Sequence, residues 1–232
     1  MVFSDVQAIA FDLDGTLVDS GPSLATAVAE ALVAVGHPPC QLTDALGWIG
    51  NGAPMLVKRA LSNSVEPDPN LSAALVEQTL AHFASAYAKH QPGPDLLYPN
   101  VAATLKSLHQ RGYKIALVTN KPSEFVADIL EGAGIAAYFE LWFGGDCLAE
   151  KKPSPLPLHT LLQHWQLEPQ QLLMVGDSRN DVLAAKAAGC RCVGLSYGYN
   201  YGQNISELNP DLVLDHFQHL LAALPAQTET CA

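Results

Sequence analysis

The chain has 232 residues, 49% of them hydrophobic, so it is long and apolar enough to bury the core of one large domain or of a domain with an insertion. Its formal net charge of −11 disfavours nucleic acid or an anionic membrane as a partner, because both require clustered Lys and Arg. No apolar run is long enough for a transmembrane helix, residues 1–7 lack a signal-peptide pattern, and the five cysteines are scattered, which together predict a cytoplasmic protein with reduced thiols.

The first predicted element is a strand that runs directly into two aspartates. Residues 6–11 are mostly apolar, as in a central strand of a parallel sheet, and Asp12-Leu13-Asp14 follows at once. Side chains alternate along an extended chain, so both carboxylates project to the same side and repel each other. Gly15 permits a tight turn after the pair, and Thr16 can supply a hydroxyl or backbone donor there.

The next segment, residues 19–92, has no convincing strand. Three amphipathic helical stretches cover approximately residues 23–36, 53–62 and 71–90. We therefore predict a helical cap domain of residues 19–92, inserted into an α/β core of residues 1–18 and 93–232. The expected hinges lie near residues 17–21 and in the Pro- and Gly-rich stretch 91–95.

After this insertion, strands and helices alternate. Strand patterns end at residues 117–120, 141–146, 172–177, 192–196 and 212–215, and helical patterns such as 101–112 and 123–134 lie between them. Such alternation implies right-handed βαβ units, so the predicted fold class is α/β, with a doubly wound, mainly parallel sheet.

Polar residues stand where several of these strands end. Thr119 and Asn120 follow one strand and Asp177 follows another, while Lys152 precedes the strand that ends at Asp177. In an open α/β sheet such groups meet at the carboxyl ends of the strands. Because Asp12, Asp14 and Asp177 would repel one another there, a hard divalent cation is required, and Mg²⁺ suits oxygen ligands and a phosphate.

Four stretches in this order, DLDGTLVDS, LVTNK, KKPSP and GDSRND, resemble the motifs of the haloacid dehalogenase superfamily, and the helical insertion resembles its C1-type cap. The resemblance spans essentially the whole chain and implies a Rossmann-like core. Further stretches, notably WIGNGAP and VGLSYGYNYG, are similar to those of the bacterial phosphoglycolate phosphatases within the superfamily. The implied activity is Mg²⁺-dependent hydrolysis of 2-phosphoglycolate through an aspartyl phosphate.

The resemblance also implies catalytic roles. Asp12 would attack phosphorus, and Asp14 would protonate the leaving alkoxide and then activate water. Thr119 would donate a hydrogen bond to the phosphoryl group. Lys152, preferred to Lys151 because it directly precedes Pro153, would neutralise charge.

The implied Mg²⁺ ligands are the carboxylates of Asp12 and Asp177 and the backbone carbonyl of Asp14, with Asp181 orienting a metal-bound water. Thr16 and Asn120 are predicted to contact the substrate.

Four further residues could bind the part of the substrate beyond the phosphate, and each also has a purely structural interpretation. Asn51 and Gly52 suit either a plain turn between helices or a loop that enters the site. Arg59 could bind a substrate carboxylate or lie on a solvated helix face, and Arg179 could face the pocket mouth or the surface. Residues 197–201, with three tyrosines, are interpreted as a packing element rather than a ligand platform.

Alternative functions of the same scaffold are another small-molecule phosphatase, a pyrophosphatase, a phosphonatase or a phosphomutase acting on a sugar phosphate. A dehalogenase is disfavoured because halide leaves without a proton, so Asp14 would have no task. A non-catalytic binding protein would be expected to lack one of Asp12, Asp14, Lys152 or Asp177. The predicted partner is a small anionic phosphate ester, with no nucleic acid or membrane, and the protein is expected to be a monomer or weak dimer.

Overall fold

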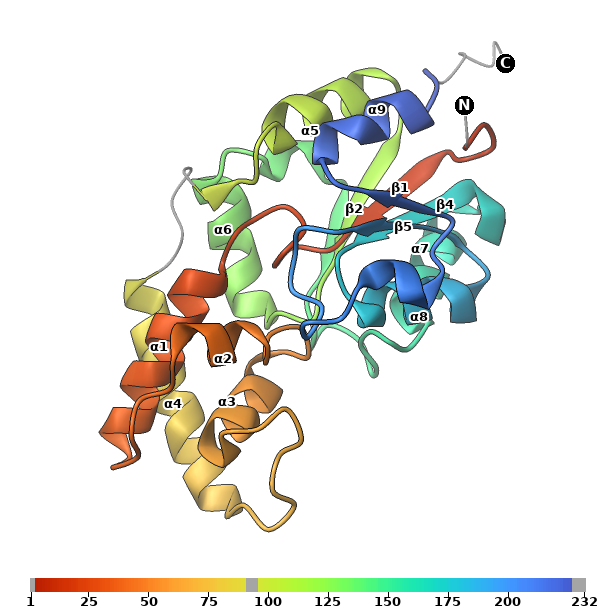
Figure 1. The fold of residues 1–232 in the computed structure, drawn as a ribbon. Helices are drawn as coiled ribbons and strands as arrows, with labels where there is room; N and C mark the ends of the chain where they lie inside the picture. Colours follow the sequence, from red (N-terminus) through yellow and green to blue (C-terminus); the bar gives the residue numbers. More distant parts are fainter. Residues whose placement is uncertain (1–2, 91–95, 227–232) are drawn as a thin grey trace.

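A computed structural model of the chain describes residues 3–90 and 96–226, and its centre is a parallel six-stranded sheet (Figure 1). The strands are β1 (Ala8–Phe11), β2 (Lys114–Val118), β3 (Leu141–Phe143), β4 (Leu172–Gly176), β5 (Arg191–Leu195) and β6 (Leu212–Leu214). Their order is β3-β2-β1-β4-β5-β6, with every neighbouring pair parallel. The predicted fold class is confirmed. β1 lies between β2 and β4, so its carboxyl end stands at the point where the strand order reverses.

Helices cover both faces of the sheet because the strand residues alternate between two cores. Ile9 and Phe11 of β1 pack on one face, whereas Ala8 and Ala10 pack on the other. The first face is covered by α5 (Val101–Gln110), α6 (Val126–Gly132) and α9 (Leu220–Ala223), the second by α7 (Leu156–Trp165) and α8 (Arg179–Ala188). Short 3-10 turns are η2 (Ser123–Phe125), η3 (Ala136–Tyr138), η4 (Pro169–Gln171), η5 (Ile205–Leu208) and η6 (Phe217–His219).

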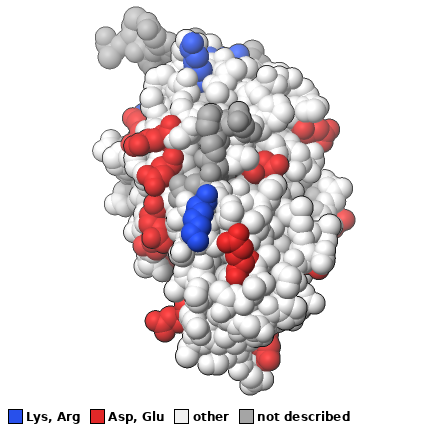
Figure 2. Space-filling view, turned by 90° about the vertical axis from the view of Figure 1, so that its left-hand side faces the viewer, with Lys and Arg blue, Asp and Glu red and all other residues white. Residues whose placement is uncertain are grey.

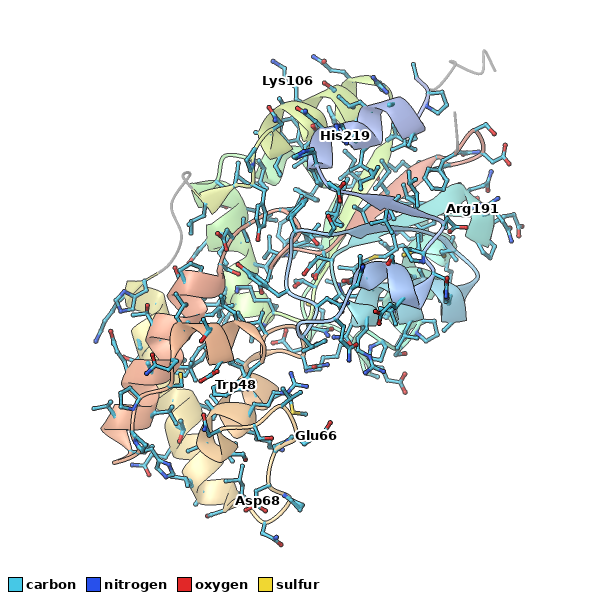
Figure 3. The ribbon with its side chains drawn as sticks, in the orientation of Figure 1. Trp48, Glu66, Asp68, Lys106, Arg191 and His219 are labelled. Atoms are coloured by element: carbon cyan, nitrogen blue, oxygen red, sulfur yellow. The ribbon has the colours of Figure 1, made fainter. Side chains whose placement is uncertain are left out.

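Between β1 and α5 the described chain contains four α-helices joined by loops, and no β-strand. It contains α1 (Gly21–Ala34), α2 (Leu42–Leu46), α3 (Ala53–Ser62) and α4 (Ala73–Lys89), which lie beyond the carboxyl ends of the strands (Figure 1). Of these, α2 was not predicted, because five residues are too short to show a helical period. Trp48 lies on the side of this group nearer the sheet, and Asp68 lies at its far tip (Figure 3).

Two neighbouring chain segments connect this helical group to the sheet. Val18 forms an antiparallel bridge with Leu97, the backbone N–H of Asp19 donates to Leu96, and that of Tyr98 donates to Leu17. Outgoing and returning chains are therefore bonded to each other. The division into a core and a cap domain stays a proposal, and the predicted hinge at residues 91–95 lies outside the described residues.

The surface contains no extensive basic patch on the face that Figure 2 shows, where acidic side chains are scattered and basic ones are sparse. Among the described residues, no helix combines the length and hydropathy needed to cross a membrane. The four cysteines in the described ranges, Cys40, Cys147, Cys190 and Cys192, are unpaired.

Candidate active site

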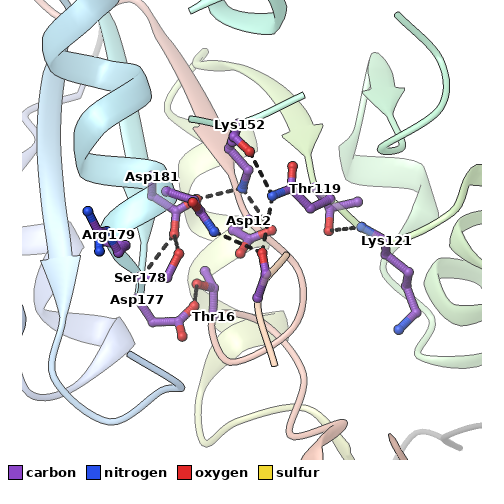
Figure 4. A network of polar contacts seen from close by, with 12 residues as sticks. Asp12, Thr16, Thr119, Lys121, Lys152, Asp177, Ser178, Arg179 and Asp181 are labelled. Carbon is purple, nitrogen blue, oxygen red and sulfur yellow. Dashed lines mark hydrogen bonds and ion pairs between the residues drawn. The ribbon is translucent and has the colours of Figure 1, made fainter. Parts of the chain in front are cut away.

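Three buried carboxylates meet at the carboxyl end of β1 and β4. Asp12 directly follows β1 and donates its backbone N–H to Val175 of β4, which brings it beside Asp177. Asp181, on the first turn of α8, completes the group, and carboxylate oxygens of the three aspartates lie within 4.8 Å of one another (Figure 4). A buried set of oxygen donors with this much negative charge fits a hard divalent cation.

The backbones of two glycines pack so closely against Asp177 that neither position has room for a side chain. A Cβ atom on Gly15, whose φ is +85°, would lie 2.4 Å from Asp177 Oδ2. A Cβ atom on Gly198 would lie 2.3 Å from Asp177 Cβ. Only glycine allows both backbones to approach the carboxylate this closely, so the loop after β1 and the loop after β5 together form a cradle for it.

Hydrogen bonds fix the orientation of Asp177. The Thr16 hydroxyl donates to Asp177 Oδ1 at 2.7 Å, and the Tyr199 backbone N–H donates to Oδ2 at 2.5 Å. Burial and the nearby Asp12 and Asp181 raise the pKa of Asp177 well above its ordinary value. The Thr16 side chain is thus occupied with a carboxylate, and its contact with a substrate stays a prediction.

Lys152 bridges two of the carboxylates. Its ammonium lies 2.9 Å from Asp12 Oδ1 and 2.5 Å from Asp181 Oδ1. The other Asp181 oxygen accepts hydrogen bonds from the backbone and hydroxyl of Ser178 in the capping box of α8. Lys151 instead donates to the Asn51 carbonyl at 3.1 Å, so of the two adjacent lysines it is Lys152 that lies at the strand ends.

Charge effects at this pair oppose one another. Burial raises the pKa of Asp12 to about 7, although Lys152 acts in the opposite direction. Burial alone would lower the pKa of Lys152, but Asp12 and Asp181 raise it, so the lysine is charged. The three buried carboxylates outnumber this single ammonium, so a bound cation would balance the remaining negative charge.

A second lysine, which the sequence analysis did not select, pairs with Asp14. Lys121 Nζ lies 2.9 and 3.1 Å from the two Asp14 oxygens, and the Ser20 hydroxyl donates to Asp14 Oδ1 at 2.5 Å. Although burial would lower the pKa of Lys121, Asp14 raises it. This lysine is the last residue of LVTNK and directly follows Thr119 and Asn120. A positive charge so close to a strand end could have identified it from the sequence as a site residue.

A small cavity of about 40 Å³ opens between the strand ends and the helical group. From the sheet side it is lined by Asp12, Asp14, Thr119, Asn120, Lys121, Pro122 and Phe125. From the helical side it is lined by Leu24, Ile49, Gly50, Gly52, Ala53, Leu56, Phe83 and Tyr87. Carboxylates, a hydroxyl, an amide and the Lys121 ammonium on the sheet side thus face a mainly apolar wall on the helical side.

The turn at residues 50–52 is bound to the core rather than free in solvent. The Gly50 carbonyl accepts hydrogen bonds from the Asn120 and Asn180 side-chain amides, at 3.1 and 2.9 Å. Asn51 accepts from the Tyr201 hydroxyl at 2.8 Å. Gly52 lines the cavity and Asn51 does not, so their predicted substrate contacts remain predictions, with Gly52 the better placed.

Neither arginine predicted to contact substrate lines the cavity. Arg59 donates to the carbonyls of Trp48 and Val65 and stacks over the Tyr201 ring at 5.1 Å. Arg179 is exposed, and its side chain lies outside the cluster of carboxylates (Figure 4). This geometry does not favour a substrate role for either residue.

The tyrosines of residues 197–201 connect loops, in accord with their interpretation as a packing element. Tyr197 donates to the Thr16 carbonyl, Tyr199 to Asp19, and Tyr201 to Asn51. Together with the hydrogen bond from the Tyr199 N–H to Asp177, these bonds connect the loop after β5 to the segment after β1 and to the turn at residues 50–52.

The geometry suits nucleophilic attack by a buried carboxylate on an anionic centre, and comparisons with other proteins agree with it. A family model described as haloacid dehalogenase-like hydrolase matches residues 6–189. The phosphoglycolate phosphatase of Aliivibrio fischeri is 50% identical over 225 residues, covering 96% of this chain and 98% of that protein. That of Vibrio vulnificus is 49% identical over 221 residues, covering 95% and 97%. The crystal structure of a predicted phosphoglycolate phosphatase from Haemophilus somnus matches with a TM-score of 0.88 and 40% identity, covering 94% and 98%.

Proposed function

The chain belongs to the haloacid dehalogenase-like hydrolase family, and we propose that it is a Mg²⁺-dependent phosphatase that hydrolyses 2-phosphoglycolate to glycolate and phosphate. The observation that carries this proposal is the meeting of Asp12, Asp14, Thr119 and Lys121 at one small cavity, with Lys152 paired to Asp12. We choose 2-phosphoglycolate as the substrate because relatives about 50% identical over nearly the whole chain are phosphoglycolate phosphatases.

In the proposed reaction, an Asp12 oxygen attacks phosphorus, the bond to the ester oxygen breaks, and Asp14 gives its proton to the leaving alkoxide. Water then attacks the aspartyl phosphate while Asp14 takes back a proton, which regenerates Asp12 and releases phosphate. Lys152, held beside Asp12, offsets the charge of the phosphoryl group, and the Thr119 hydroxyl donates to it.

The cation proposed for this site is Mg²⁺, bound by the carboxylates of Asp12 and Asp177 and the backbone carbonyl of Asp14. Its fit is supported by the buried cluster of carboxylates and by the glycine cradle around Asp177. When bound, it would neutralise negative charge during phosphoryl transfer. Asp181 would act indirectly, through Lys152 and the water around the cation.

The cap predicted for residues 19–92, whose described helices are α1 to α4, is proposed to close over the substrate and exclude bulk water. Its apolar contribution to the cavity wall, from residues such as Leu56 and Phe83, supports this role. We further propose that the protein acts in the cytoplasm, as a monomer or weak dimer.

The proposed function is tested by measuring phosphate release from 2-phosphoglycolate, sugar phosphates, pyrophosphate and nucleotides, with Mg²⁺ and after removal of metal by EDTA. The highest kcat/KM is expected for 2-phosphoglycolate, with activity lost in EDTA and restored by excess Mg²⁺. A different compound preferred by more than about tenfold, equivalent to about 1.4 kcal/mol, would refute the assigned substrate. Full activity in EDTA would refute the metal requirement.

A further inference from the structure

Lys121 is a buried cation in the cavity that the proposed mechanism leaves without a task. Its side chain is only 3% exposed, and its ammonium donates hydrogen bonds to both oxygens of the Asp14 carboxylate. Among the described residues that line the cavity it is the one with a positive charge. Lys152 lies apart from it, between Asp12 and Asp181, where the phosphoryl group would bind.

Tyr87 presents a second unused group at the same place. It comes from α4, is completely buried, lines the cavity, and its ring centroid lies 4.6 Å from Lys121 Nζ. Within the described part of the chain its hydroxyl makes no hydrogen bond of normal geometry. Because a buried hydroxyl without a partner costs free energy, this one is suited to a ligand group that enters the cavity.

The remaining basic groups near the helical side are committed elsewhere. Arg59 is bonded to two backbone carbonyls, and Lys151 to the Asn51 carbonyl. Lys58 is exposed on α3 and does not line the cavity. A negatively charged group in the cavity, other than the phosphate, would therefore meet Lys121 first.

We propose that Lys121 and Tyr87 form the binding site for the substrate's carboxylate. This inference rests on the proposed function, since the substrate must carry a carboxylate. In 2-phosphoglycolate the carboxyl carbon stands two bonds from the ester oxygen that Asp14 would protonate. A cation in contact with Asp14 is therefore at a suitable distance from that carboxylate once the ester oxygen meets Asp14.

The same contact links recognition to reaction. The ammonium of Lys121 carries three N–H donors, and two of them are directed at the Asp14 carboxylate while the Tyr87 ring lies close by. An incoming carboxylate competes for these donors and releases Asp14 toward the leaving oxygen. A phosphate ester with a neutral leaving group lacks this competitor, so Asp14 stays paired.

The test compares 2-phosphoglycolate with ethyl phosphate, which has the same number of carbons but no carboxylate. In Lys121→Met we expect the ratio of kcat/KM for 2-phosphoglycolate to kcat/KM for ethyl phosphate to fall by about 100-fold, because any change at Asp14 affects both substrates, whereas loss of a carboxylate contact affects only one. An equal loss on both substrates would overturn the inference, because Lys121 would then act only through Asp14. Retained preference for 2-phosphoglycolate would overturn it as well.

A second variant keeps the test valid if Lys121→Met folds poorly. Tyr87→Phe removes only the hydroxyl, and we expect a several-fold higher KM for 2-phosphoglycolate, weaker inhibition by glycolate, and a smaller rise in KM for ethyl phosphate. An unchanged KM for 2-phosphoglycolate would remove Tyr87 from the site. Lys89→Met, an exposed lysine on the same helix, is the matched control and should leave both substrates unaffected.

Failure of the inference is distinguishable from failure of the proposed function. If the wild-type enzyme itself does not prefer 2-phosphoglycolate to ethyl phosphate, the proposed substrate is wrong. If the wild-type preference is strong and Lys121→Met retains it, only the assignment of the carboxylate site is wrong.

Discussion

The two sides of the cavity are built on different principles. At the strand ends, charged groups hold one another: Lys152 bridges Asp12 and Asp181, and Asp177 accepts two hydrogen bonds. The helical side contributes mainly apolar side chains, and among the described residues its buried Tyr87 hydroxyl makes no hydrogen bond of normal geometry, with the Lys121 ammonium beside it. A preorganised polar side suits the reaction common to all substrates, whereas a mainly apolar wall with one polar group suits selection among them.

The largest effect is expected from Asp12→Asn, which keeps the size of the side chain but removes the nucleophile. We expect kcat for 2-phosphoglycolate to fall by about 10⁴-fold or more, with circular dichroism unchanged. Ethyl phosphate hydrolysis should fall equally, because the strand-end side serves every substrate. A variant that retained full activity would rule out the covalent mechanism.

The glycine cradle provides the next test of the strand-end side. In Gly198→Ala the new Cβ would collide with Asp177, so we expect the Mg²⁺ concentration for half-maximal activity to rise by about 10- to 100-fold. Gly202→Ala is the control on the same loop. Its φ of +73° makes alanine strained, but the space around it is open, so it should cost stability without changing Mg²⁺ dependence. Equal Mg²⁺ dependence in both variants would contradict the cradle.

The raised pKa of Asp12 predicts a pH-dependent cost in the metal-free protein. Its folded pKa of about 7 exceeds the unfolded value of 3.8, so the folded protein holds the proton more tightly. The resulting stabilisation is complete below pH 3.8 and is lost as the pH rises through about 7.

Relative to Asp12→Asn, the metal-free wild type should therefore lose free energy of unfolding, on the order of 4 kcal/mol, between those pH values. Urea denaturation in EDTA at a series of pH values measures this difference. A difference that stayed constant with pH would show that Asp12 titrates normally, and the strand ends would then be less desolvated than the structure implies.

The smallest effect on activity is expected from Arg59→Met on the helical side. Because Arg59 binds the Trp48 and Val65 carbonyls and stacks on Tyr201, the variant should lose about 1–2 kcal/mol of unfolding free energy. KM for 2-phosphoglycolate should change by less than about threefold. A much larger rise in KM with stability intact would restore Arg59 as a substrate ligand and weaken the assignment to Lys121.

Much of the fold was predictable because its signals are local. Each of the six strands was found where an apolar run had been expected, and α3 has the predicted limits, since burial on one or both faces leaves a clear period in the sequence. The short α2 escaped prediction because five residues do not complete such a period.

The sequence by itself determined that Asp12, Asp14, Thr119 and Asp177 would share one edge of the sheet, because parallel strands must bring their carboxyl ends together. Only the tertiary structure decided the partners of the long basic side chains. Lys121, in the loop after β2, meets Asp14 across 107 positions and Tyr87 of α4, while Arg59 turns to backbone carbonyls instead of the cavity. Such side chains reach far and rotate freely, so their contacts depend on the packing of helices against the sheet, which no local spacing encodes.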